Sequence, residues 1–344
     1  MQEILVLQQK IIPEMMELLE KRYKILRTIY YNQPIGRRIL ADSVNMGERI
    51  VRTEINFLKS QNLIDINTPG MTITEEGEEI INKLKDFIHE LKGLSEIEEC
   101  IKERFKLQEV IIVPGDIDED KTITKELGRV AANYIKRILK DKDIVALTGG
   151  STIKEVVDNL PKFSNLSNVL VIPARGGMGR NVETQANTLA AHFANRVGGS
   201  YKLLHVPDNL SNDALNTLIN EKDIKEVIDN IHNANILLFG IGRADEMALR
   251  RGLANEQLDE ILKIGAVGEA FGYYFNENGE MVYSTPTIGV NDDVISKISN
   301  RIAIAGGQSK AEAIVAIESN LYESVLITDE GAARKIIDII SKRE

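Results

Sequence analysis

The sequence predicts two folded domains of different class: a small, mostly helical head and a larger α/β domain with a parallel sheet, joined by a helical linker. Three observations predict this division. Apolar residues recur at helical spacing over the first 60 residues and are followed by a hairpin signal; an acidic helical stretch comes next; from Gln108 onward, short apolar runs alternate with helical runs. We place the domain boundaries at 1–73, 74–106 and 107–344.

Three helices are predicted in the head. The first covers residues 14–31 and ends before Pro34, because proline disfavours helical backbone in the residue that precedes it. A short helix follows at Arg37–Ser43, and a third helix comes after a tight turn. Asn45 and Glu48 have the spacing of a capping box at the start of the third helix.

The head ends in a hairpin signal. Two strand-like runs, Leu63–Ile66 and Met71–Thr74, flank the turn sequence Thr68-Pro69-Gly70. Three helices followed by a hairpin have the element order of a winged helix-turn-helix. The sequence therefore predicts an N-terminal module that binds double-stranded DNA.

The net charge of the chain argues against DNA binding, but the distribution of charge favours it. The chain carries a formal net charge of −10 at pH 7. Within residues 21–60, however, nine Lys and Arg stand against three Asp and Glu. A phosphate backbone responds to such a local patch, so this segment is the expected contact surface.

The third helix of the head has an apolar face and a polar face. Val51, Ile55 and Leu58 form a stripe that would face the core, and the polar side chains opposite are typical of contacts to bases and phosphates. The alternative is a solvated charged face without a ligand. Two arginines at the start of the preceding helix would contact the DNA backbone. The candidate DNA-binding residues are Arg37, Arg38, Arg49, Arg52, Thr53, Asn56 and Lys59.

The composition and periodicity of residues 74–106 predict an acidic helical connector. Thr74 is placed to cap a helix that keeps helical periodicity up to Leu91, and Gly93 interrupts it. A second helical segment continues to about Phe105. Both a solvated spacer and an oligomerisation helix fit this pattern.

The C-terminal domain alternates strands with helices, which predicts a parallel sheet with helices on both faces. Ligands of such sheets bind at the carboxyl ends of the strands. The predicted strands are Val110–Val113, Ile144–Leu147, Val169–Ile172, Leu203–Val206, Ile236–Phe239, Ile302–Ala305 and Val325–Ile327. The predicted helices are 125–140, 152–160, 188–197, 223–231, 310–318 and 330–340.

Two glycine-led loops, Thr148–Thr152 and Gly306–Lys310, each follow a predicted strand and open a predicted helix. Such loops aim backbone N–H groups at an anion. A lysine at a helix start opposes the helix dipole unless an anion is present. Two further glycine loops are expected at Gly240–Gly242 and Gly265–Glu269. Each loop alone could be an ordinary turn between strand and helix; together they predict a phosphate site.

Arginines lie near these loops in the sequence. Arg175 stands among glycines after a predicted strand, and Arg250-Arg251 is a basic pair in an acidic domain. Two dianionic phosphates need two cationic subsites. Several fixed cations therefore favour a bisphosphate over a monophosphate.

The segments Thr148–Thr152, Gly240–Gly242 and Gly306–Ala311 resemble the phosphosugar-binding loops of SorC/DeoR-type sugar regulators. The effector domain of that family is similar in fold to phosphosugar isomerases and deaminases, and the resemblance extends over nearly the whole chain. It implies a DNA-binding repressor of glycolytic genes with fructose 1,6-bisphosphate as its inducer. Carried over by position, the effector-binding residues are Gly149, Gly150, Ser151, Thr152, Arg175, Gln185, Arg250, Arg251, Glu269 and Lys310.

Two other functions stay open. One is a sugar-phosphate isomerase or deaminase, with Asp245 and Glu246 as candidate general bases. The deaminase pattern would place a histidine in the stretch Gly242–Met247, which has none, so we expect no catalysis. The other is a regulator of a different sugar operon that responds to another phosphosugar or a polyol.

Composition limits the remaining classes. Cys100 is the only cysteine, which excludes an intrachain disulfide, and with four scattered histidines it predicts no metal site and no cofactor besides the effector. No apolar stretch approaches the length of a membrane span, and no signal-peptide core is present. We expect a cytoplasmic homo-oligomer, a dimer or on DNA a tetramer, that binds operator DNA and a sugar phosphate.

Overall fold

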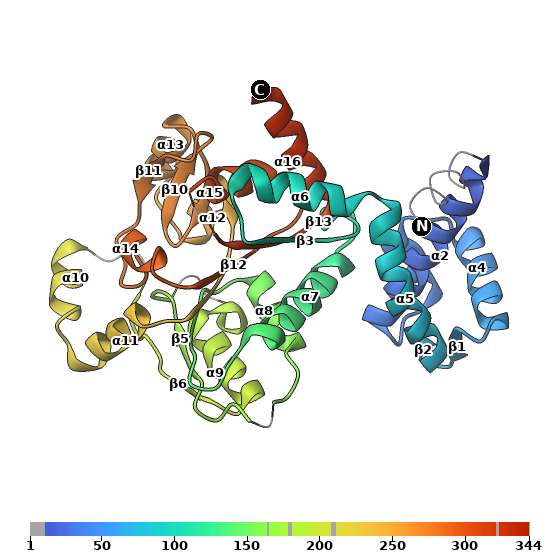
Figure 1. The fold of residues 1–344 in the computed structure, drawn as a ribbon, viewed down its shortest axis with the longest axis horizontal. Helices are drawn as coiled ribbons and strands as arrows, with labels where there is room; N and C mark the ends of the chain where they lie inside the picture. The colour runs from blue at the N-terminus through green and yellow to red at the C-terminus, as the bar shows by residue number, and fades with distance from the viewer. Residues whose placement is uncertain (1–10, 164, 178–180, 208–210, 321–322, 344) are drawn as a thin grey trace. The chain divides into compact units, whose positions relative to one another are not determined.

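The computed structural model describes residues 11–163, 165–177, 181–207, 211–320 and 323–343 (Figure 1). Their contacts divide the chain into two compact units. The first contains the residues up to Glu96 together with Glu119–Ile123, and the second contains Ile97–Asp118 and the residues from Thr124 onward.

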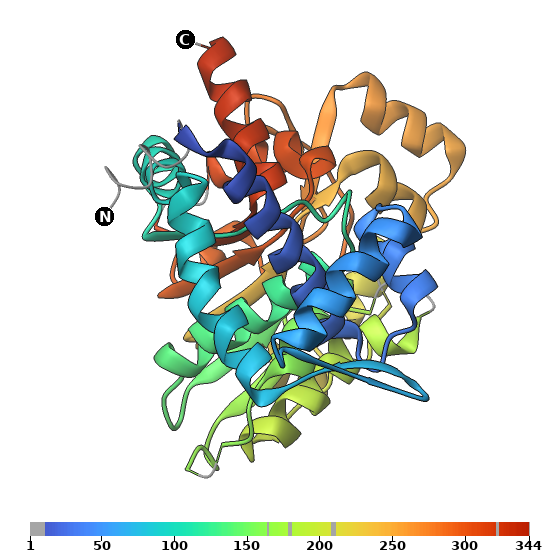
Figure 2. The ribbon, with the colours of Figure 1, turned by 90° about the vertical axis from the view of Figure 1, so that its right-hand side faces the viewer.

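The first unit is a helical bundle with a hairpin, shown in blue and cyan in Figure 2. Its core is made of side chains that are at most 1% exposed, among them Ile25, Leu40, Val51, Leu58 and Ile64. The antiparallel hairpin pairs Ile64 with Ile73. The elements are α2 Pro13–Asn32, α3 Arg37–Val44, α4 Glu48–Ser60, β1 Ile64–Asn67, β2 Gly70–Ile73 and α5 Glu75–Leu91.

The helix ends of this unit correct one prediction and confirm another. Asn45 does not cap α4; it adopts a left-handed backbone (φ 54°) and ends α3, with its N–H donating to Ala41 and Asp42 carbonyls. Asparagine tolerates this conformation better than most residues, and Gly47 is the residue before α4. Thr74 does cap α5, because its hydroxyl accepts a hydrogen bond from the Gly77 N–H at 3.0 Å.

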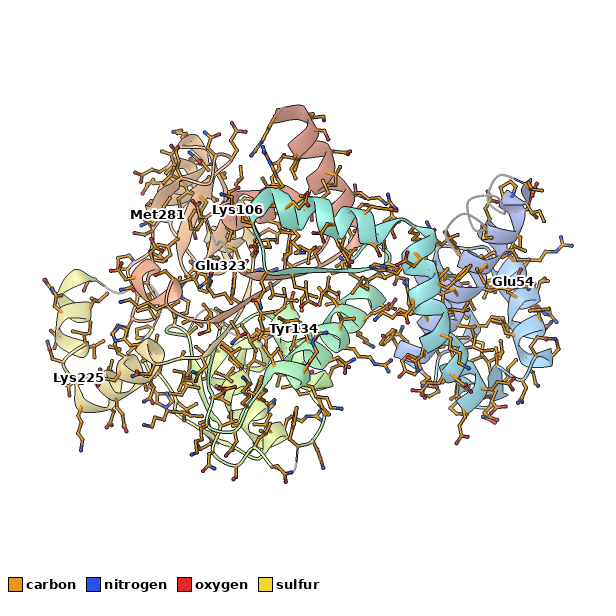
Figure 3. All side chains as sticks on the ribbon, viewed as in Figure 1. Glu54, Lys106, Tyr134, Lys225, Met281 and Glu323 are labelled. Carbon is orange, nitrogen blue, oxygen red and sulfur yellow. The ribbon has the colours of Figure 1, made fainter. Side chains whose placement is uncertain are left out.

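Glu54 on α4, labelled in Figure 3, is a buried carboxylate that the helical pattern places on the inner side of the helix. Lys21 Nζ lies 2.6 Å from one carboxylate oxygen, and Arg22 Nε donates to the other at 2.8 Å. Burial raises the pKa of Glu54, but the hydrogen bonds from the two cations outweigh it, so the pKa lies below its ordinary value. Two of the basic residues of the head are thus committed to an internal carboxylate.

The second unit is built on a seven-stranded sheet in which every strand pair is parallel. The sheet order is β3-β13-β12-β7-β4-β5-β6, which confirms the predicted α/β class. The strands are β3 Glu109–Val113, β4 Ile144–Leu147, β5 Leu170–Pro173, β6 Ser200–Tyr201, β7 Ile236–Gly240, β12 Asn300–Ile304 and β13 Val325–Asp329.

Helices connect these strands. The helices are α6 Leu94–Phe105, α7 Thr122–Ile138, α8 Ser151–Asn159, α9 Ala186–Val197, α10 Asn212–Leu218, α11 Lys222–His232, α12 Ala244–Arg250, α13 Asn255–Lys263, α14 Asp292–Ile295, α15 Ala311–Glu318 and α16 Glu330–Arg343. The predicted linker 74–106 consists of α5, which belongs to the first unit, and α6, most of which belongs to the second. No helix among the described residues is long and apolar enough to cross a membrane.

One predicted strand is wrong. Residues 203–206 are not in a strand; the sheet ends instead with β6 at Ser200–Tyr201. Leu204 is buried, but its backbone is bonded by a side chain: its N–H donates to Asn187 Oδ1 at 3.0 Å, and its carbonyl accepts from Asn187 Nδ2 at 3.1 Å. An asparagine thus replaces a strand partner, which the apolar pattern does not reveal.

A second, antiparallel sheet was not predicted. It comprises β8 Gly242–Arg243, β9 Ala266–Ala270, β10 Tyr273–Asn276 and β11 Met281–Ser284, in the order β11-β10-β9-β8. The expected glycine loop at Gly265–Glu269 is therefore wrong, since most of it is strand β9. Gly268 lies so close to α15 that a Cβ would be 2.9 Å from the Cα of Ala313, so its role is packing.

Glu318 at the end of α15 is fully buried and accepts a hydrogen bond from Ser324 Oγ at 2.6 Å. Burial raises its pKa to about 8, against the opposing effects of Ser324 and Arg301. The folded protein therefore holds a proton that the unfolded chain releases near pH 4.5. This contribution to stability is present below that pH and is lost as pH rises to about 8.

We expect Glu318→Gln to reduce this loss of stability with rising pH, because the amide keeps the shape and carries no titratable proton. The measurement is the urea midpoint between about pH 5 and 8.5. Glu312→Gln, at an exposed position of the same helix, is the control. An equally steep loss in Glu318→Gln and in the wild type would show that another group is responsible.

Candidate functional site

A cavity of about 420 Å³ lies at the carboxyl ends of four adjacent strands, β12, β7, β4 and β5. After β4 the chain adds strands on one side of it, and from β7 onward it adds them on the other side. The cavity therefore lies at the switch point of the sheet, where parallel α/β folds bind ligands. Thr148 and Gly240 line it from the two sides of that point and are joined by a hydrogen bond of 3.3 Å.

The first glycine loop forms one wall of this cavity. Gly150 has φ 121°, and its N–H donates to the Thr184 carbonyl at 2.8 Å. A Cβ on Gly149 would be 2.6 Å from the same carbonyl oxygen, so both glycines are required by the turn. Helix α8 begins directly afterwards at Ser151, and the amides of its first turn have no acceptor within the helix. This wall can bind an anion.

The second glycine loop contributes differently from the prediction. Of its residues only Lys310 lines the cavity. The Gly307 N–H donates to Asp329, with both carboxylate oxygens at 3.0 Å, and the Ser309 N–H donates to Asp118 Oδ2 at 2.9 Å. Backbone amides of this turn are thus bonded to carboxylates, and the turn serves to hold the lysine.

Among the residues that the structure describes, four cationic side chains line the cavity: Arg175, Arg250, Arg251 and Lys310. They differ in exposure. Arg175 is 6% exposed and the Arg251 side chain 2%, whereas the Arg250 side chain is 60% exposed. Only two carboxylates, Glu246 and Glu269, are among the described lining residues. The cavity therefore carries an excess of positive charge at its wall.

Glu269 on β9 is buried between two of these arginines. Its Oε1 accepts a hydrogen bond from Arg251 and lies 3.6 Å from Arg175 Nη1. The Gly272 N–H donates to the same oxygen. This carboxylate fixes the positions of Arg175 and Arg251, and a buried ion cluster of this kind keeps its geometry only while its partners remain.

Lys310 has a lowered pKa. Burial is the main cause, because it removes water from the ammonium group, and the nearby charge of Arg250 adds to it. The carboxylates of Glu246, Asp118 and Asp329 act in the opposite direction. A phosphate dianion beside this side chain would compensate both effects.

The ten residues proposed from sequence to contact an effector all line this one cavity. The structure adds lining residues that were not among these ten candidates, some inside the expected glycine loops and the others outside them. These are Thr148, Ile153, Gly176, Asn181, Thr184, Ala186, Gly240, Ile241, Gly242, Glu246, Met247 and Phe271. Of these, Gly240–Gly242 had been singled out as a loop, and Glu246 only as a candidate base for an enzyme.

In the first unit, the seven candidate DNA-binding residues are all exposed. Val51, Ile55 and Leu58 on the other side of α4 are buried, as predicted. The polar residues Arg49, Arg52, Thr53, Asn56 and Lys59 therefore form a continuous exposed face of α4, which we call the basic face.

Several other basic residues in the segment 21–60 form ion pairs with carboxylates of the first unit. Lys21 and Arg22 bind Glu54, and Arg27 binds Asp120. Arg38 has only an exposed contact, 3.4 Å, to Glu48, and such surface pairs contribute little. The cations left at the surface are mainly those of the basic face and of the start of α3.

Comparison with known families matches both units. The model of the "CggR N-terminal DNA binding domain" matches residues 18–88, and that of the "Putative sugar-binding domain" matches residues 89–338. The chain is 44% identical over 337 residues to the central glycolytic genes regulator of Bacillus subtilis, covering 98% of this chain and 99% of that protein. It is 43% identical over 338 residues to the protein of the same name from Priestia megaterium, covering 98% and 99%.

Solved structures agree. A SorC family transcriptional regulator from Enterococcus faecalis is 38% identical, with a TM-score of 0.66, and the match covers 70% of this chain and 99% of that one. The full-length sorbitol operon regulator SorC from Klebsiella pneumoniae, 20% identical, shares the fold with a TM-score of 0.65 over 92% of this chain and 99% of that one. The protein consists of a DNA-binding domain followed by a sugar-binding domain with a parallel sheet. It belongs to the family of the central glycolytic genes regulator.

Proposed function

We propose that the protein is a transcriptional repressor of glycolytic genes that fructose 1,6-bisphosphate releases from its operator. The observation that carries the proposal is the single cavity in which the start of α8, Lys310 and three arginines converge. The relatives that share 43–44% of its sequence are named for glycolytic genes, which supports the choice of a glycolytic metabolite.

One phosphate of the effector would lie on the first glycine loop. The residues Gly149–Thr152 offer backbone amides and two hydroxyls at the start of α8, and Lys310 adds a positive charge. The lowered pKa of Lys310 supports this assignment, because the ammonium lies in a place where it lacks water.

The other phosphate would face the arginines. Arg250 and Arg251 follow each other at the end of α12, and Arg175 lies with Arg251 against Glu269. Gln185 and the Glu269 carboxylate would contact sugar hydroxyls between the two phosphates. Because Glu269 also holds two arginines, its contribution to binding is in part the positioning of those cations.

The head would act as a winged helix-turn-helix, with the basic face of α4 in the major groove and Arg37 and Arg38 on the phosphate backbone. A homo-oligomer would present two heads to two half-sites. The effector weakens operator binding only as far as it prefers the state that does not bind DNA.

The proposal includes the absence of catalysis and of any cofactor, and a cytoplasmic location. The relatives from Bacillus subtilis and Priestia megaterium are named as regulators of genes, which supports a sensing role. An effector domain similar in fold to sugar-phosphate isomerases and deaminases would here bind without turnover. Conversion of fructose 6-phosphate, glucosamine 6-phosphate or ribose 5-phosphate by the purified protein would contradict this.

The direct test is a gel shift on DNA from the promoter of its own gene. We expect fructose 1,6-bisphosphate to dissociate the complex of the wild-type protein with DNA. The variants Arg250→Ala and Lys310→Ala should still bind the operator, but dissociation should need at least about tenfold more of the bisphosphate. Lys263→Ala, exposed on α13 and outside the cavity, is the control. Arg175 is a poorer choice because its loss leaves buried Glu269 with fewer partners. Stronger binding of a monophosphate in calorimetry would favour a different phosphosugar effector.

We expect Arg52→Ala to lower operator affinity by about 1–3 kcal/mol if Arg52 reads a base, and by less, with a weaker salt dependence, if it contacts a phosphate. Effector affinity should be unchanged. Lys83→Ala, exposed on α5 beside Glu79, controls for loss of a positive charge elsewhere in the first unit. Equal operator affinity in the Arg52 variant and the wild type would remove α4 from the proposed contact surface.

Effector binding should be coupled to proton uptake at Lys310, because a phosphate dianion favours the charged ammonium whose pKa is lowered in the unliganded protein. At about pH 8.5 the phosphates are already dianionic. Calorimetry in two buffers of different ionisation enthalpy measures the uptake. Lys310→Arg, which stays charged, should bind the effector with little proton uptake; the same uptake in both proteins would assign the proton to another group.

A further inference from the structure

The loop between β3 and α7 touches the turn that carries Lys310. We call its residues Asp116–Asp120 the aspartate strap. The strap begins in the second unit and ends in the first, since the division between the units falls between Asp118 and Glu119. Its two ends therefore make contacts in different units of the same chain.

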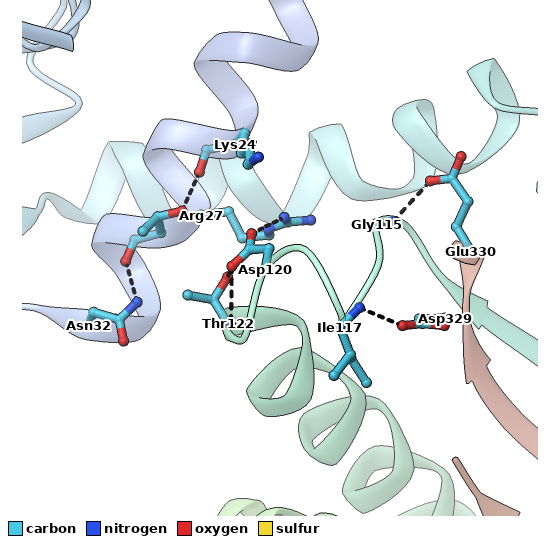
Figure 4. A network of polar contacts seen from close by, with 10 residues as sticks. Lys24, Arg27, Asn32, Gly115, Ile117, Asp120, Thr122, Asp329 and Glu330 are labelled. Atoms are coloured by element: carbon cyan, nitrogen blue, oxygen red, sulfur yellow. Dashed lines mark hydrogen bonds and ion pairs between the residues drawn. The ribbon is translucent and has the colours of Figure 1, made fainter. Parts of the chain in front are cut away.

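The first end of the strap holds the lysine-bearing turn. Asp118 Oδ2 accepts a hydrogen bond from the Ser309 N–H at 2.9 Å, and Asp116 Oδ2 accepts one from Gln308 Nε2 at 2.6 Å. The Ile117 N–H donates to Asp329 Oδ2 at 2.7 Å (Figure 4). Three consecutive residues of the strap are thus bonded to this turn or to the carboxylate beneath it.

The glycines of the turn are explained by the strap. A Cβ on Gly306 would be 2.6 Å from Ile117 Cδ1, and one on Gly307 would be 2.7 Å from Asp118 Oδ1. Gly307 also has φ 98°. These glycines therefore permit close approach of the strap, and neither lines the cavity.

The Asp118 carboxylate and an effector phosphate would both interact with the Lys310 ammonium group and the start of the segment that carries it. The Asp118 carboxylate opposes the lowering of the Lys310 pKa, and it accepts a hydrogen bond from the Ser309 amide at the start of a helical segment. A dianion bound at Lys310 would repel this carboxylate and take over its stabilising effect on the ammonium. Occupancy of the cavity and the position of Asp118 are therefore linked electrostatically.

The other end of the strap is fixed within the first unit. Asp120 Oδ2 accepts a hydrogen bond from Arg27 Nη2 at 2.9 Å, and both residues are 5% exposed. Asp120 Oδ1 accepts from the N–H and the hydroxyl of Thr122 at the start of α7 (Figure 4). Arg27 lies on α2, which packs against α3 and α5. A buried ion pair of this kind is sensitive to small displacements.

We propose that the aspartate strap transmits occupancy of the effector cavity to the DNA-binding unit, with Asp118 as the sensing residue and the Asp120–Arg27 ion pair as the receiving contact. The inference rests on the proposed function. Asp118 and Asp120 are two residues apart, at most about 7 Å along the chain. A displacement of Asp118 should therefore move the Asp120 carboxylate as well.

The test compares Asp118→Ala with Glu119→Ala in the full-length protein. Glu119 lies between the two aspartates, is exposed, and has no ion pair or side-chain hydrogen bond to any described residue, so its variant removes one charge from the strap without a contact. In Asp118→Ala we expect fructose 1,6-bisphosphate to bind about two- to fivefold more tightly, because a like charge is removed. The ratio of operator affinities without and with the bisphosphate should fall to within about twofold of one.

If Asp118→Ala binds the bisphosphate but keeps the wild-type ratio of operator affinities without and with it, the proposed role of the strap is wrong. A second measurement needs no effector: hydrogen exchange in the unliganded protein should be faster in the amides of α2 around Arg27 for Asp118→Ala and unchanged for Glu119→Ala. If the wild type responds to no sugar phosphate, the proposed function fails, and this exchange measurement still decides on the strap. Equal exchange in α2 for the two variants would refute it.

Discussion

One buried carboxylate, that of Asp329 at the end of β13, joins three separate segments of the second unit. It accepts backbone hydrogen bonds from Ile117 in the strap, Gly307 in the lysine-bearing turn and Ala332 at the start of α16. Burial raises its pKa, and these three amides oppose that effect. Because a buried charge is tolerated only with such partners, the three segments keep a fixed arrangement, and the position of Lys310 depends on it.

The cavity at the carboxyl ends of the strands holds its positive groups in fixed positions. A helix start and a partly desolvated lysine lie on one side of it, and arginines held by Glu269 lie on the other. Cations held in place before the ligand arrives lose little entropy on binding. For the proposed bisphosphate effector, cations held in this way favour affinity and discrimination between one and two phosphates.

Local sequence patterns predicted most of the head and the parallel sheet, because helical periodicity and strand–helix alternation reflect burial directly. They failed where a side chain replaces backbone pairing, as Asn187 does at Leu204, and where glycines permit packing, as in β9. The cavity residues were found by resemblance and by phosphate chemistry. The aspartate strap was not, since its contacts join residues about 190 positions apart, and no local pattern records such a pairing.

The first unit is not continuous in sequence. It also includes the five residues Glu119–Ile123, which follow strand β3 of the parallel sheet. A fragment that ends at Leu91 would lack the Asp120 carboxylate that faces Arg27 inside this unit. Recombination between regulators at the apparent boundary would likewise pair one parent's arginine with the other parent's loop. Exchange of DNA-binding heads within this family is therefore constrained by a short segment that lies outside the head, and position 27 and position 120 should be inherited together.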